Sequence, residues 1–139
     1  MQHSLSTTLV KELTHIIEQG KKQVAVQINS TITVVYWEVG NRIIKEILQH
    51  KRAGYGKQII AQIGLQLTVS YGKGWSEKHL RHCIRIAETF TDEKNLYALS
   101  RELSWTHLRS LMYIEDKLKR NFYIEMCKLE KWSTRTLQN

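Results

Sequence analysis

The chain has 139 residues, no proline, seven glycines and a formal net charge of +8, which suits one helical domain around a single core. No apolar run approaches membrane-spanning length, and the N-terminus lacks the pattern of a signal peptide, so we expect a cytoplasmic protein without a membrane partner. Cys83 and Cys127 belong to no CxxC pair, which is typical of reduced thiols in that compartment.

The first predicted element is a long amphipathic helix, or two nearly collinear ones. Apolar residues recur at spacings of three and four from Leu9 to Ile47, which is the helical period. Residues 31–35 are all β-branched and favour a strand in isolation, but the helical period continues through them. Trp37 and Ile44 begin a second apolar line, which Leu48 extends. We therefore expect this helix to pack on two sides.

A helix pair follows a loop with two glycines over residues 51–56. The first helix is predicted over Lys57–Ser70, with its apolar residues at Ile59, Ile60, Ile63, Leu67 and Val69. Two glycines within Tyr71–Trp75 end this helix. Ser76 is the predicted N-cap of the second helix, which extends to Glu88. The apolar stripe of this helix consists of Leu80, Cys83, Ile84 and Ala87.

Three more helices and a final helical turn complete the predicted fold. They are Asn95–Glu102 with Asp92 as N-cap, a helix from Ser104 or Thr106, Asp116–Lys131, and a turn from Ser133. Five side chains of the helix over 116–131 are expected to point inward: Leu118, Phe122, Ile124, Met126 and Leu129. A helix that starts just before Asn139 suggests a fragment of a longer protein. The predicted class is all-α, a multi-helix domain with a long N-terminal amphipathic helix and a helix-turn-helix-like pair, as one unit or as lobes over 1–52 and 53–139.

Positive charge is concentrated on the helix pair. Residues 51–90 hold seven Lys and Arg against two Asp and Glu, a net charge of +5, whereas residues 1–50 and 91–139 carry +1 and +2. This distribution favours a polyanionic partner, nucleic acid before an anionic membrane surface. A solvated basic surface is the alternative interpretation.

The second helix of the pair supplies the main candidates for nucleic-acid contact. They lie off its apolar stripe: Lys78, Arg81, His82 and Arg85. Arginine can pair with guanine edges, and both Lys and Arg neutralise phosphates. Lys73, Arg52 and Lys57 are expected to hold the nucleic-acid backbone. Gly72 and Gly74 either let a phosphate approach main-chain N–H groups or merely serve the turn. An ordinary exposed helix face remains the alternative.

A second helix-turn-helix is also considered over residues 96–111. Its polar face would consist of Arg101, His107 and Arg109. A helical corner packed by Trp105 explains the same segment equally well.

Metal binding and catalysis have weak support in the sequence. His79 and Cys83 share a helical face, but two ligands are too few for a structural zinc site, so His79 packed beside the core is the better interpretation. Ser104 and His107 lack an obvious acidic partner, and no P-loop, dinucleotide fingerprint or nuclease-type carboxylate–lysine cluster is present. We expect no metal, no cofactor and no catalytic residue.

Six motifs occur in one order along the chain: Tyr36–Gly40, Tyr55–Gly56, Tyr71–Ser76, Leu103–His107, Arg120–Tyr123 and Trp132–Leu137. Together they resemble the N-terminal domain of the YhcG family of bacterial proteins, over about Leu13 to Leu137. Trp75 stands where that family's pattern has Phe, and Gly64 stands where it has a small polar residue.

Full-length members of that family join this helical domain to a C-terminal PD-(D/E)xK nuclease domain. The resemblance therefore implies a module that recognises or positions DNA for a nuclease domain and is not itself catalytic. No nuclease residue can be carried over to this chain. The competing hypothesis is a protein-interaction or homodimerisation module, with its seam along Lys21–Gln49 and Trp37 on the second apolar line.

Overall fold

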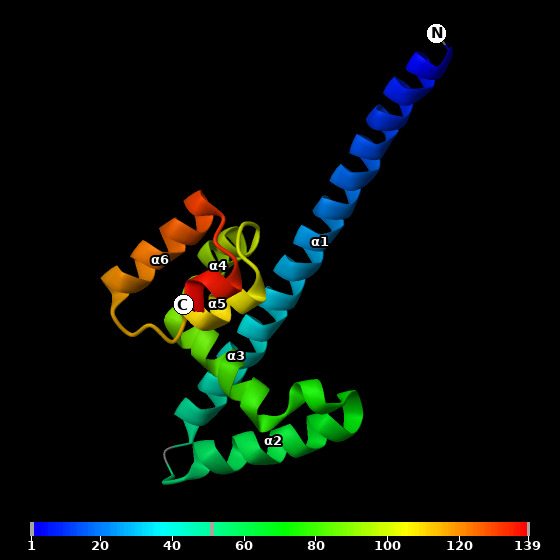
Figure 1. Ribbon diagram of the computed structural model, residues 1–139. Helices are drawn as coiled ribbons and strands as arrows, with labels where there is room; N and C mark the ends of the chain where they lie inside the picture. Colours follow the sequence, from blue (N-terminus) through cyan, green and yellow to red (C-terminus); the bar gives the residue numbers. More distant parts are fainter. Residues whose placement is uncertain (1, 51, 139) are drawn as a thin grey trace.

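The computed structural model describes the backbone of residues 2–50 and 52–138 and the side chains of residues 7–50 and 52–138. These residues form helices and no strand, which confirms the all-α prediction. The elements are α1 (Gln2–Gln49), α2 (Tyr55–Tyr71), the 3₁₀ helix η1 (Lys73–Trp75), α3 (Glu77–Thr89), α4 (Glu93–Ser100), α5 (Trp105–Leu111), α6 (Lys117–Glu130) and α7 (Thr134–Gln138). Figure 1 shows α1 as one straight rod whose N-terminal half projects away from the other helices.

The C-terminal half of α1 is the spine on which the other helices pack. Residues 31–35 are helical despite their β-branched side chains. The side of α1 that faces the other helices carries small residues, and Ser30 and Thr33 are fully buried. A Cβ at Gly40 would collide with the carbonyl oxygen of Cys83 in α3. The backbones of α1 and α3 therefore meet at a glycine, which allows their close approach.

Asn29 connects α1 to the segment between α4 and α5. Its Nδ2 donates to the carbonyl oxygens of Ser100 at 2.8 Å and Leu103 at 2.9 Å. Its Oδ1 accepts from the backbone N–H of Trp105 at 2.9 Å. One side chain thus pairs backbone groups at the end of α4 and the start of α5, which have no partner within their own helices.

Two groups of buried residues form the core, and α1 contributes to both. The larger group is Trp37, Ile86, Ala87, Leu96, Leu103, Leu108, Leu111, Met112, Ile124 and Cys127. The smaller group is Ile43, Ile60 and Leu80, beneath α2. Trp37 is only 9% exposed, and its indole N–H donates to the carbonyl oxygen of Phe90 at 2.6 Å.

Helix ends follow most of the predicted capping residues. The side chains of Asp92, Ser104 and Asp116 each accept a hydrogen bond from a backbone N–H in the first turn of α4, α5 and α6. Gly72 ends α2 with a φ of 102°, a left-handed value that favours glycine. Ser76 does occupy the N-cap position of α3, but its side chain makes no capping hydrogen bond, so that part of the prediction is wrong.

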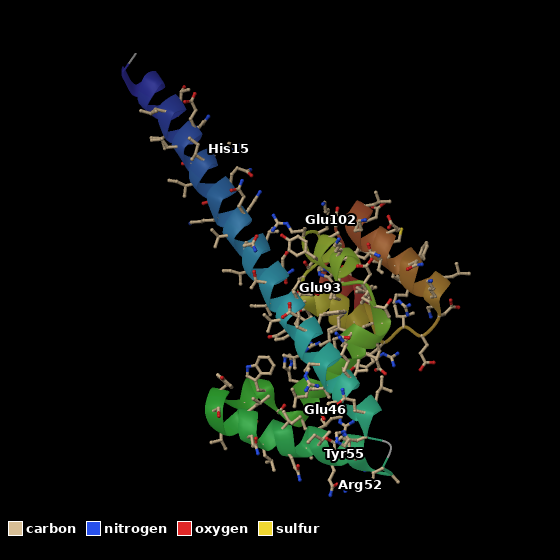
Figure 2. All side chains as sticks on the ribbon, turned by 180° about the vertical axis from the view of Figure 1, so that it is seen from behind. His15, Glu46, Arg52, Tyr55, Glu93 and Glu102 are labelled. Atoms are coloured by element: carbon tan, nitrogen blue, oxygen red, sulfur yellow. The ribbon has the colours of Figure 1, made fainter. Side chains whose placement is uncertain are left out.

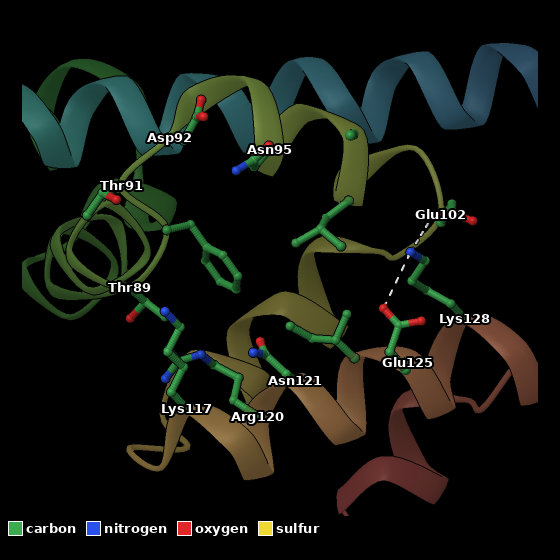
Figure 3. Close-up of a pocket in the computed structure, with 14 residues that line it drawn as sticks. Thr89, Thr91, Asp92, Asn95, Glu102, Lys117, Arg120, Asn121, Glu125 and Lys128 are labelled. Carbon is green, nitrogen blue, oxygen red and sulfur yellow. Dashed lines mark ion pairs between the residues drawn. The ribbon is translucent and has the colours of Figure 1, made fainter.

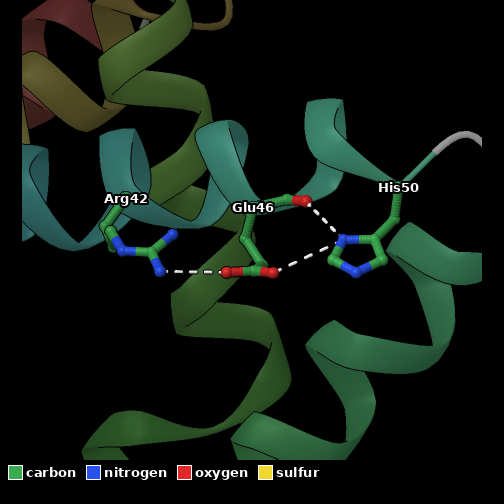
Figure 4. A network of polar contacts seen from close by, with 3 residues as sticks. All are labelled: Arg42, Glu46 and His50. Atoms are coloured by element: carbon green, nitrogen blue, oxygen red, sulfur yellow. Dashed lines mark hydrogen bonds and ion pairs between the residues drawn. The ribbon is translucent and has the colours of Figure 1, made fainter.

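A short polar network joins the end of α1 to the start of α2 (Figure 4). Arg42 Nη2 lies 2.9 Å from Glu46 Oε1, and His50 Nδ1 lies 3.4 Å from Glu46 Oε2 and 3.1 Å from the Glu46 carbonyl oxygen. The ring of His50 stacks on Tyr55, with 4.3 Å between ring centroids. These contacts fix the point at which the chain reverses direction.

The prediction of which apolar residues point inward on α6 is partly wrong. Ile124 is buried and Met126 half-buried, but three of the predicted inward residues are exposed: Leu118, Phe122 and Leu129. Helix α6 packs on the core through Ile124 and Cys127, and those three residues lie on the other side of the helix. Val69, near the end of α2, is likewise exposed.

Candidate nucleic-acid interface

Helix α3 presents its four predicted cations on one broad side. Lys78, Arg81, His82 and Arg85 follow the i, i+3, i+4, i+7 pattern of a single helical face. Arg81 differs from the others in its partner, because its Nη2 is 3.3 Å from Glu77 Oε1. Among these residues, the charge of Arg81 is thus the one paired with a carboxylate.

Helix α5 adds Arg109 beside these cations. The pKa of His82 is lowered, first by burial and then by the nearby charges of Arg109 and Lys78. The pKa of His79 is lowered by burial and then by His82 and Arg109. Arg109 of α5 thus acts on both histidines of α3, and Lys78 acts on one of them, so residues of the two helices form one positive region. We call the surface formed by Lys78, His82, Arg85, Arg109 and Tyr113 the basic–aromatic face.

Contacts with Tyr113 and with the end of α5 hold this face in place. His82 Nδ1 lies 2.6 Å from Tyr113 Oη. Arg85 Nε donates to the carbonyl oxygen of Met112 at 3.0 Å, and its guanidinium lies 5.3 Å from the centre of the Tyr113 ring. Tyr113 was not among the predicted site residues. It is 31 residues from His82 in the sequence, and only the packing of the chain after α5 brings it there.

An aromatic cluster lies beside the face and contains His79. The ring centre of Tyr36 lies 4.4 Å from that of His79, 4.8 Å from that of Trp105 and 5.8 Å from that of Trp75. His79 Nε2 is buried and has no hydrogen-bond partner, which explains why the neutral ring is favoured. The prediction that His79 packs beside the core is confirmed.

The remaining predicted contact residues lie outside α3 and α5. Lys73 is exposed in η1. Arg52 lies in the loop before α2, with its guanidinium 5.8 Å from the centre of the Tyr55 ring, and Figure 2 places both residues at the junction of α1 and α2. Lys57, on α2, lines the same hollow as Glu77.

The two turn glycines support the turn interpretation. The N–H of Gly72 donates to the carbonyl oxygen of Thr68, and the N–H groups of Trp75 and Ser76 donate to those of Gly72 and Lys73. These main-chain donors already have partners inside the turn.

The three polar residues of the second helix-turn-helix considered above, Arg101, His107 and Arg109, lie in different surroundings. Arg101 Nη1 donates to Gln27 Oε1 at 3.0 Å on α1. His107 completes a capping box with Ser104, and its Nε2 lies 2.7 Å from the carbonyl oxygen of Trp132. Arg109 alone joins the basic–aromatic face. The contact of 2.7 Å between Ser104 Oγ and His107 Nδ1 belongs to the helix cap.

A hollow of about 440 Å³ between the start of α4 and α6 contains charges of both signs (Figure 3). Lys128 Nζ lies 3.4 Å from Glu102 Oε2 and 3.7 Å from Glu125 Oε1. Arg120 Nη1 donates to the carbonyl oxygen of Ile114 at 2.7 Å. Lys128 and Arg120, two of the cations that line the hollow, thus already have partners.

A metal-ligand cluster and a membrane-spanning helix are both absent from the described part of the chain. Among residues 2–50 and 52–138, no three or more His, Cys, Asp or Glu side chains gather as a metal ion would require. No helix in the same residues is both long and apolar enough to cross a bilayer.

The structure defines an all-α domain built on one long helix, in which α3 and α5 carry a group of cationic side chains on the surface. The profile of the DUF1016 N-terminal domain family matches residues 12–139, and the chain belongs to this family. It is also similar to the protein named "Putative nuclease YhcG" of Escherichia coli (strain K12), with 32% identity over 68 residues. That match covers 48% of this chain and 18% of the relative. No solved structure matches.

Proposed function

We propose that this domain binds duplex DNA through the basic–aromatic face and positions it for a nuclease domain, without itself being catalytic. The observation that carries the proposal is the gathering of Lys78, His82, Arg85 and Arg109 from two helices onto one surface.

The electrostatics of the face suit a polyanion. Lys78 and Arg109 are exposed, and the one ion pair that α3 makes among the described residues joins Arg81 to Glu77. Burial lowers the pKa of His82 most, and the charges of Arg109 and Lys78 lower it further, so two positive charges act on this ring. A phosphate would relieve this repulsion, and the release of its counterions would contribute to affinity.

The geometry also suits a DNA groove. Helix α3 packs on α1 with one side and presents cations on another, as a recognition helix does. Arg85 is held by its contacts with Met112 and Tyr113, so it loses little conformational freedom on binding.

The nuclease context comes from the relative. The similar protein is named a nuclease, and the matched segment is a small part of its length. We infer that cleavage is the task of another domain, and that this domain supplies recognition or positioning.

Fluorescence anisotropy of a labelled random duplex across a salt series tests the DNA-binding proposal. The double variant Lys78→Ala/Arg109→Ala should bind more weakly and lower the log–log salt slope by about 1.8, because each phosphate contact contributes about 0.9. The control Lys45→Ala/Lys119→Ala removes the same charge from exposed positions on α1 and α6. Equal losses in the two double variants, or no binding by the unmodified chain at low salt, would contradict the proposal.

Incubation of the purified chain with duplex and Mg²⁺ or Mn²⁺ tests the non-catalytic role. The duplex should remain intact. Cleavage that survives stringent purification would show that the domain is an enzyme.

A further inference from the structure

Helix α1 exposes a row of large apolar side chains that begins at Leu9 and continues to Val35. Six of them, which we call the outer stripe, are each between 41% and 58% exposed: Leu9, Leu13, Ile17, Val24, Ile28 and Val35. Every described side chain from residue 7 to residue 25 is exposed, and Figure 2 shows this part of α1, with His15 labelled, extending away from the rest of the fold.

The outer stripe lies on roughly the opposite side of α1 from the residues that pack on the domain. At about 100° per residue, Ser30, Thr33 and Gly40 face the other helices, and the outer stripe faces away from them. Between residues 7 and 35, the helix therefore buries Ser30 and Thr33 and exposes its large apolar side chains, the reverse of a segment that packs on its own domain alone. A seam through Trp37 is ruled out, because Trp37 is buried in the core.

We propose that a second copy of this chain covers the outer stripe, with the two α1 helices antiparallel about a two-fold axis near residue 22. The stripe extends over 27 residues, or about 40 Å, close to the three to four heptads that sustain a helix pair. Leu13, Val24 and Val35 recur every 11 residues, a period that keeps two helices in contact with little supercoiling.

The antiparallel orientation follows from the shape of the surface. A groove of about 440 Å³ between α1 and α4 continues the stripe at Val35, and Val34 and Tyr97 also line it. About an axis near residue 22, Leu9 of the second copy reaches Val35 beside this groove. The same register places Val24 opposite Gly20, a residue whose missing side chain leaves room for it. The surface is thus self-complementary, as a two-fold interface requires.

Charge favours the same orientation. Residues 7–35 carry three Lys and two Glu, whereas residues 36–139 carry a net charge of +7. Two nearly neutral arms can pair without repulsion. A parallel pair would bring two lobes of charge +7 together at one end, whereas an antiparallel pair separates them by far more than the Debye length of about 10 Å.

Sedimentation velocity over a concentration series tests the interface. The unmodified chain should sediment as a dimer, and Ile17→Glu/Ile28→Glu should sediment as a monomer. Its melting temperature should match that of the unmodified chain diluted to its monomer, because both side chains are exposed within one chain. The control His15→Glu/Gln19→Glu adds acidic groups to another side of the same arm and should remain dimeric. A monomer at every concentration up to about 1 mM would overturn the proposal and assign the stripe to a different polypeptide.

Disulfide trapping tests the orientation. The native thiols Cys83 and Cys127 are 0% and 2% exposed, so introduced cysteines can be followed. A mixture of Leu9→Cys and Val35→Cys chains should form a 9–35 disulfide between copies. Neither variant should cross-link alone, because like residues would lie about 39 Å apart, and a disulfide needs Cα atoms within about 7 Å. Cross-linking of each variant alone would indicate a parallel pair and overturn the proposal.

Discussion

Replacing Gly40 with alanine should separate the two helices at the centre of the fold. A Cβ at this position would collide with the carbonyl oxygen of Cys83 and with the backbone of Ile84. These are backbone atoms inside α3, so no side chain can rotate away to make room. The helices would have to move apart by an ångström or more, which would loosen the core residues on both sides of the crossing.

Two opposing terms set the magnitude. Alanine is favoured over glycine inside a helix by up to about 1 kcal/mol. Overpacking a well-packed interior costs typically about 1–3 kcal/mol and sometimes more, and a backbone obstacle places this site at the upper end. The free energy of unfolding should therefore fall by about 2 kcal/mol. For a chain of this size, the melting temperature should fall by about 7 °C.

Thermal unfolding followed by circular dichroism measures this change, with Gly20→Ala as the matched control. Gly20 lies in the same helix with no atom within 4 Å of an added Cβ. Because the arm around Gly20 has no packing within one chain, its replacement should increase helix content without lowering the melting temperature, at a concentration where the chain is monomeric. A Gly40→Ala protein as stable as the unmodified chain would refute the close crossing of α1 and α3.

If Gly40→Ala does not fold, Gly64→Ala gives a milder test of the same reasoning. An added Cβ at Gly64 would lie 2.8 Å from the backbone nitrogen of Glu77, where α2 meets the start of α3. The substitution should destabilise the protein even though helix propensity alone predicts a gain. A rise in stability would contradict the packing of α2 on α3.

Two further predictions concern buried titratable groups. The lowered pKa values of His79 and His82 mean that the unfolded chain binds more protons than the folded chain between the lowered values and about 6.5. The free energy of unfolding, measured by urea titration, should therefore decrease as the pH falls from 7.5 through this window. The variant His79→Phe should show a smaller decrease. An unchanged dependence of the unfolding free energy on pH in this variant would contradict the burial of His79. Burial also raises the pKa of Cys83 to about 12 and raises that of Cys127, so both thiols should resist iodoacetamide at pH 8 until the chain unfolds, and rapid labelling of the native protein would show that the core is open.

The sequence predicts the helix ends well because local chemistry determines them. Asp92, Ser104 and Asp116 cap helices where the pattern places them, and Gly72 ends α2. Each of these signals acts within one helical turn. Ser76 shows the limit of these local signals. It stands between η1 and α3, and the Ser76 hydroxyl does not reach a free N–H group of α3. Gly64 shows another limit: its low helix propensity is evident from the sequence, but the nearby backbone of Glu77 is not.

Burial was harder to predict than helix position. A helical period shows that apolar side chains share a face, but not whether another element covers that face. Leu118, Phe122 and Leu129 on α6 illustrate this, as does the outer stripe on α1. The candidate site was likewise only partly predictable from the sequence. The cations of α3 are evident from the sequence, but only tertiary packing brings Arg109 and Tyr113 to the same surface.

The stability of the projecting half of α1 depends on whether another polypeptide covers it. The described side chains of residues 7–25 are all exposed, so this part of the helix gains no free energy from packing within one chain. Isolated helices of about this length are marginal in water, and Gly20 weakens this one by up to about 1 kcal/mol relative to alanine. Pairing with a second copy would supply the missing burial. The arm should therefore be most helical when the outer stripe is covered, so helix content should increase with protein concentration in parallel with the dimer fraction.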